Sequence, residues 1–94
     1  MLTRVVKMHL SADFIAEFKI LFQSLQVKIA AFEGCQGVQL LQDEHNPEVF
    51  FTISTWDDAT KLENYRKSPF FQQTWAVVKP NFKSKAEAWS LLDT

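Results

Sequence analysis

The most informative stretch of this chain covers residues 55–75, which read TWDDATKLENYRKSPFFQQTW. Trp56 ends an apolar run, and one of the two aspartates that follow it is expected to provide the N-cap oxygen of a helix. A second helix start comes at Ser68-Pro69, because a serine cap followed by proline is a favoured order. We therefore expect a strand that ends at Trp56 and then two successive helical segments.

The longest predicted helix lies upstream and covers residues 12–32. Ser11 is expected to supply its N-cap oxygen, and Gly34 to end it, because glycine adopts the left-handed cap conformation without steric cost. Its apolar residues recur at steps of three and four, which places them on one helical face. They are Phe14, Phe18, Phe22, Leu25, Ile29 and Phe32.

Three segments before residue 57 have the pattern of strands. Residues 2–10 are β-branched and apolar with polar interruptions, and Gly37 is expected to open a second strand, Val38 to Gln42. The polar turn at residues 43–47 then leads into a return strand. That strand carries Val49, Phe51, Ile53 and Thr55 on one face and Phe50, Thr52, Ser54 and Trp56 on the other.

The C-terminal part is expected to contain the second helical region and the last strand. Pro80 should end the helix near Lys79, since proline lacks the amide that continues a helix, and residues 86–92 then form a strand. The resulting order is βαββαβ, which is typical of a ferredoxin-like α+β fold with an antiparallel sheet. We expect one domain, residues 1–94, whose second sheet face is covered by another copy of the same chain.

Composition and charge restrict the classes of partner. Ten Lys and Arg against eleven Asp and Glu give a net charge of −1, which provides no field to attract nucleic acid or anionic membranes. The return strand also lacks the basic-Gly-aromatic start typical of RNA-recognition domains. We expect a soluble, cytoplasmic protein for three reasons. The chain has a single cysteine, it has no apolar run of about 20 residues, and its N-terminus lacks the apolar core of a secretory signal.

Three motifs resemble the antibiotic biosynthesis monooxygenase family, whose members are small dimeric α/β barrels. They are Glu33-Gly34-Cys35-Gln36-Gly37, Thr55-Trp56 and Tyr65-Arg66-x-Ser68-x-Phe70-Phe71, and together with the element order they extend the resemblance over nearly the whole chain. The family includes cofactor-free oxygenases that form quinones, haem-degrading enzymes and isomerases of small molecules. The resemblance therefore implies the fold more strongly than any one chemistry.

The quinone-forming branch implies a phenolic substrate that reacts with oxygen in a dry aromatic cavity, without flavin or metal. On this reading Tyr65 exchanges a proton with the substrate or donates a hydrogen bond to it, and Arg66 stabilises the anion. The predicted substrate-binding residues are Ser54, Trp56, Phe71 and Trp75. The haem-degrading branch is disfavoured, because its ligating histidine corresponds to Trp75, and an indole cannot ligate iron.

Plainer interpretations remain open for the same residues. Tyr65 and Trp75 have helical spacings expected of core residues, and Trp56 could simply fill the interface between sheet and helices. Arg66, about 100° around the helix from Tyr65, is expected to form a salt bridge. Cys35 follows a helix end, where a reactive thiolate is not expected, and the spacing of His9, Cys35 and His45 predicts no metal site. Two other functions are therefore carried forward: a non-enzymatic homodimer that binds a small apolar molecule or is purely structural, and an isomerase of a small hydroxy-ketone.

Overall fold

The computed structural model describes all of residues 1–94 and has the predicted order of elements. The strands are β1 (Leu2–His9), β2 (Cys35–Gln42), β3 (Val49–Trp56) and β4 (Glu87–Leu92). The helices are α1 (Ile15–Ala30), α2 (Ala59–Arg66) and α3 (Pro69–Val78), with 3-10 segments η1 (Ala12–Phe14) before α1 and η2 (Lys79–Asn81) after α3.

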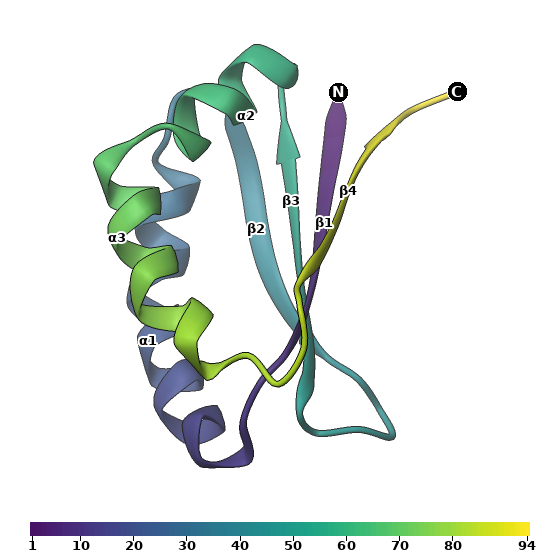
Figure 1. Ribbon diagram of the computed structural model, residues 1–94. Coiled ribbons are helices and arrows are strands. Elements are labelled where there is room, and N and C mark those ends of the chain that lie inside the picture. Colours follow the sequence, from purple (N-terminus) through teal and green to yellow (C-terminus); the bar gives the residue numbers. More distant parts are fainter.

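The strands form one antiparallel sheet in the order β2-β3-β1-β4. All three helices lie over one face of this sheet, and no element covers the other face (Figure 1). This arrangement is the predicted ferredoxin-like α+β fold. In β1 and β3 the even-numbered residues face the helices, and they pair as Leu2 with Trp56, Arg4 with Ser54, Val6 with Thr52 and Met8 with Phe50.

α1 is shorter than predicted at both ends. The side chain of Ser11 does not cap it; instead the Ser11 carbonyl accepts a hydrogen bond from the Phe14 amide, and η1 intervenes. At the other end the amides of Ala31 and Phe32 bond to carbonyls three residues back. This tighter bonding ends the α-helix at Ala30.

Gly34 has a left-handed backbone, with φ +86°, but it does not end α1 as predicted. It lies in the turn that leads into β2, where a Cβ atom would collide with the side chain of Lys61. Gly37 does not open β2 either, because it lies at a bulge where the register with β3 shifts. β2 begins at Cys35, ahead of the predicted start at Val38.

The helix caps that follow β3 have the predicted chemistry. Asp58 caps α2, and its Oδ1 accepts from the amide of Lys61 at 3.0 Å. Ser68 caps α3, and its Oγ accepts from the amide of Phe71 at 3.1 Å. α3 stops before Pro80, which lies in η2, as the proline predicts.

The core lies between α1 and the sheet. The predicted helical stripe is buried from Phe14 in η1 to Ile29 in α1, whereas Phe32 is half-buried against the core. Phe50 and Trp56 on β3 are 1% and 0% exposed, so the helix-facing side of this central strand is the deepest part of the molecule. None of the helices combines the length and apolar character needed to cross a bilayer.

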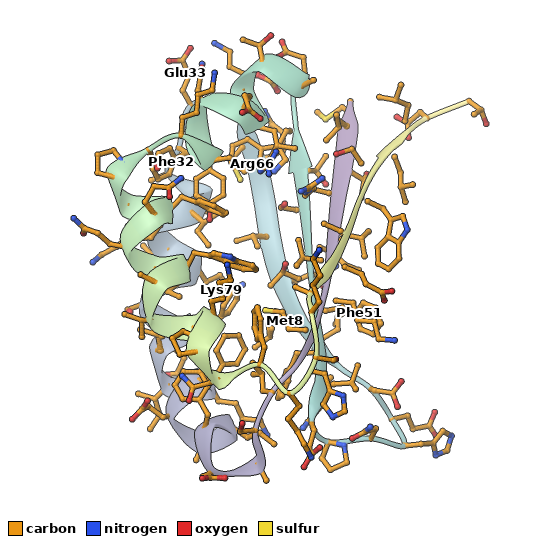
Figure 2. All side chains as sticks on the ribbon, viewed as in Figure 1. Met8, Phe32, Glu33, Phe51, Arg66 and Lys79 are labelled. Carbon is orange, nitrogen blue, oxygen red and sulfur yellow. The ribbon has the colours of Figure 1, made fainter.

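The uncovered sheet face also carries large apolar side chains. They are Val5, Leu41, Phe51, Ile53, Trp89 and Leu91, and we call this set the open face. Leu41 and Trp89 are each 44% exposed, and Leu91 is 50% exposed. Figure 2 shows Phe51 on the open face, whereas Met8 points toward the helices.

Candidate functional site

A cavity of about 280 Å³ lies between the helices and the sheet. Its volume is close to the lower end of the roughly 300–1,000 Å³ range of small-molecule sites. Most of its wall is apolar and comes from α1, α3 and the helix-facing side of the sheet. Seven of the lining residues carry a polar side-chain group: Arg4, Thr52, Ser54, Tyr65, Arg66, Thr74 and Trp75.

Five of the six predicted site residues line this cavity. They are Ser54, Tyr65, Arg66, Phe71 and Trp75. The sixth, Trp56, is fully buried behind the wall, where its ring stacks on Tyr65 with centroids 5.1 Å apart and an interplanar angle of 25°. The structure thus gives Trp56 a supporting position rather than a place on the cavity surface.

Ser54 and Trp56 are joined by a hydrogen bond within β3. The indole Nε1 of Trp56 donates to Ser54 Oγ at 2.9 Å, and both residues are buried. Because a hydroxyl both accepts and donates, Ser54 keeps its own O–H for a group inside the cavity. The bond therefore orients Ser54 without using up its donor.

The aromatic rings of α3 form the part of the wall opposite the sheet. Phe71 and Trp75 are stacked, with centroids 5.8 Å apart and an interplanar angle of 11°. Tyr65 meets Phe71 edge to face at 5.1 Å, and Phe82 meets Trp75 in the same manner at 5.3 Å. These contacts hold flat apolar surfaces in fixed orientations, which suits a flat apolar ligand.

Tyr65 is the only phenol of the chain. Burial raises the pKa of Tyr65 to about 12, and the nearby Cys35 contributes to the rise. The side chain is therefore a neutral O–H donor at physiological pH and not a base. Burial also raises the pKa of the Cys35 thiol, so the thiolate is not favoured, as predicted, although the cause is burial within β2 rather than a helix end.

Arg66 is both a salt-bridge partner and a cavity residue, the two alternatives that the sequence left open. Its Nη1 donates to Oε2 of Glu63 at 3.2 Å, which is the expected salt bridge, and its side chain also lines the cavity. In Figure 2 Arg66 lies between the helical layer and the sheet. A guanidinium at this place can bind an anionic group of a ligand.

Arg4 is a cavity residue that the sequence reasoning missed. It is half-buried on β1, and its Nη1 donates to Ser90 Oγ of β4 at 2.9 Å. Strand alternation was the available signal, because Arg4 has the same parity as the core residues Leu2 and Met8. The same alternation places Thr52 on the cavity side of β3.

The histidines lie away from the cavity. His9 pairs with Val49, on the open-face side of the sheet, and its Nε2 lies 2.9 Å from Oε1 of Glu48. Lys83 Nζ donates to the same carboxylate oxygen at 3.0 Å. These two contacts hold the pKa of Glu48 below its ordinary value, His9 having the larger effect. No three His, Cys, Asp or Glu side chains are grouped so that they could hold a metal ion.

Comparisons with known proteins agree with this architecture. A family model described as "Antibiotic biosynthesis monooxygenase" matches residues 1–77. The chain is similar to the crystal structure of an antibiotic biosynthesis monooxygenase, with a TM-score of 0.92 and 17% identity over 100% of this chain and 99% of the other.

Two further solved structures have the same fold. One is a conserved protein from Methanosarcina mazei Go1, with a TM-score of 0.91 and 23% identity over 100% of this chain and 94% of the other. The other is a putative antibiotic biosynthesis monooxygenase from Deinococcus radiodurans, with a TM-score of 0.90 and 16% identity over 100% and 93%. No curated protein matches the sequence.

Proposed function

Because the chain belongs to the antibiotic biosynthesis monooxygenase family, we propose that it is a cofactor-independent monooxygenase of a small aromatic, phenolic substrate. The observation that supports this proposal is the cavity itself, where stacked rings of α3 face polar groups from β3 and α2. A flat substrate would lie against Phe71 and Trp75. Its oxygen would meet Ser54 and Tyr65.

The proposed reaction converts an activated CH2 group and O2 into a C=O group and water. The ionised substrate passes one electron to O2, and the resulting radical and superoxide combine to a peroxide anion. That anion takes up the proton that the substrate lost, which gives a hydroperoxide. Loss of water from the hydroperoxide breaks its O–O bond and leaves the ketone of a quinone. Oxygen is thus the only oxidant, and the substrate supplies all the electrons.

The protein's part in this chemistry is to favour the substrate anion. Arg66 would stabilise the negative charge, and Tyr65, with a pKa of about 12, would donate a hydrogen bond to the substrate oxygen rather than remove its proton. The cavity wall carries no carboxylate or histidine that could serve as a base. The substrate is therefore expected to lose its proton to water, helped by the nearby guanidinium.

The proposal is tested by incubating metal-free protein with a panel of anthrones and naphthols under oxygen. We expect quinone to form faster than in buffer, with oxygen uptake equal to substrate loss. Tyr65→Phe should retain the fold and lose roughly ten- to a hundred-fold in rate, the worth of one hydrogen bond to a charged group. Product formation at the buffer rate across the whole panel would rule out the oxygenase.

A second candidate function is a non-enzymatic homodimer that binds a small apolar ligand. The missing base favours it, because binding needs no proton transfer. Its signature is a ligand that binds without being consumed under oxygen. An isomerase of a hydroxy-ketone would also need a group to move the proton, and it would turn over without taking up oxygen.

The open face supports the proposal that the protein acts as a dimer. Its apolar side chains would be covered if two sheets packed face to face around a two-fold axis, which is an isologous arrangement. Such packing leaves both cavities intact, because each lies on the helix-facing side of its own sheet.

A further inference from the structure

The cavity wall has a one-sided charge. Two guanidinium groups line it, from Arg4 on β1 and Arg66 on α2, and no aspartate, glutamate, lysine or histidine does. The only other titratable group on the wall is the phenol of Tyr65, which is neutral at physiological pH. Most of the cavity lining is therefore apolar, and the only charged side chains on it are two cations.

The nearest carboxylate only partly balances this charge. Glu63 bonds to Arg66 at 3.2 Å from outside the wall, and it also interacts with Arg4. Two guanidiniums thus share one carboxylate. Burial lowers the pKa of Arg4, and the positive charge of Arg66 lowers it further, so both effects disfavour the charged guanidinium. A bound anion beside Arg4 would stabilise its positive charge.

Arg4 is also held in place. Its backbone lies between Ser54 on β3 and Ser90 on β4, and its side-chain Nη1 donates to Ser90 Oγ at 2.9 Å. A guanidinium fixed through one nitrogen keeps further N–H donors in a planar fork that matches a carboxylate. The exposed side chains of Arg66 and Ala88 place the open side of the cavity near these donors.

We propose that the natural ligand is a small aromatic acid whose carboxylate is bound by Arg4 and Arg66, while its ring lies among the cavity aromatics. This inference rests on the proposed function, in that the cavity must bind a small molecule at all. It adds the class of ligand: an apolar ring system with an ionised acid group. Arg4 becomes the specificity-determining residue for that group.

Calorimetric titration with 2-naphthoate and with its neutral counterpart 2-naphthamide tests the proposal. We expect the wild type to bind the acid about ten-fold or more tightly than the amide, because a charge-assisted bidentate pair adds at least that much. Arg4→Met should weaken binding of the acid far more than binding of the amide, and so remove the difference. Arg4→Lys should restore only part of it, since an ammonium lacks the planar fork.

Lys67→Gln is the matched control, because Lys67 is exposed and absent from the wall but its loss changes the net charge equally. It should leave both affinities unchanged, and circular dichroism checks that each variant folds. If Arg4→Met does not fold, Arg66→Gln carries the same test. Amide binding with no preference for the acid would overturn this inference while leaving the proposed function standing, whereas failure of both probes to bind would overturn both.

Discussion

Trp56 and Ser54 lie two residues apart on the same face of β3, and their side chains are joined by a hydrogen bond. The indole Nε1 donates to the serine Oγ at 2.9 Å. The pair connects the deepest residue of the sheet with the wall of the cavity. Trp56 therefore belongs to the packed core, whereas Ser54 faces the cavity.

Ser54→Ala should lower the free energy of unfolding by about 1–3 kcal/mol, because it leaves the buried indole N–H without an acceptor. Ser24→Ala is the matched control, since the exposed Ser24 donates only to the carbonyl of Leu21 in α1. It should change stability by less than about 0.5 kcal/mol. Urea unfolding followed by circular dichroism measures both, and equal losses would contradict the role assigned to the buried pair.

The Tyr65 phenol should ionise only at a high pH. Tyr65 is the only tyrosine, so tyrosinate absorbance reports it alone, and the midpoint should lie near pH 12 in the folded protein and about pH 10 in denaturant. Since the folded pKa is raised, this group's contribution to stability is complete below about pH 10 and is lost as the pH rises toward 12. A folded-state midpoint near 10 would show that the hydroxyl is not buried.

Gly34→Ala should cost about 1–3 kcal/mol of unfolding free energy, because φ is +86° and the added Cβ would collide with Lys61. Gly37→Ala is the comparison, since a Cβ there meets no atom within 4 Å and only the backbone, at φ +152°, is strained. Chemical unfolding of both variants should therefore rank Gly34 as the more sensitive position. The reverse order would mean that the turn before β2 can rearrange.

Sedimentation should find the wild-type chain as a dimer at micromolar concentration. Trp89→Lys adds a charge to the open face and should give monomers, because two ammonium groups would be forced into an apolar interface. Ile20→Lys is the control, since Ile20 is 70% exposed on α1, on the far side of the molecule from the open face. A wild-type monomer would remove the argument for sheet-to-sheet pairing.

Sequence periodicity predicted the fold well because both layers have strong patterns. The phenylalanine stripe of α1 and the alternation in β3 each identify one buried face, and capping chemistry located the starts of α2 and α3. The limits of α1 were wrong because 3-10 bonding at its ends depends on local geometry that periodicity does not record. The predicted start of β2 was wrong because periodicity does not record the bulge at Gly37 either.

The candidate site was predicted less completely. Periodicity gives the face of a strand residue but not its depth, so it left open whether Trp56 binds substrate or fills the interface between sheet and helices; in the structure Trp56 is buried and stacked on Tyr65. Arg4 was missed because arginine is usually a surface residue, and its parity was not weighed against that tendency. The proton chemistry of Tyr65 also depends on burial, which only the assembled fold determines.

The make-up of the cavity wall has a consequence for experiments at different acidities. The wall contains no histidine or carboxylate, the side chains that ordinarily titrate in or just below the neutral range, and the pKa of its one phenol, Tyr65, is raised to about 12. No histidine or carboxylate of the cavity lining would therefore contribute to a binding profile across the neutral range, since both histidines of the chain lie outside the cavity. Any bell-shaped or sigmoidal profile in that range would report the ionisation of the bound compound itself, which makes acidity a probe of the ligand's identity.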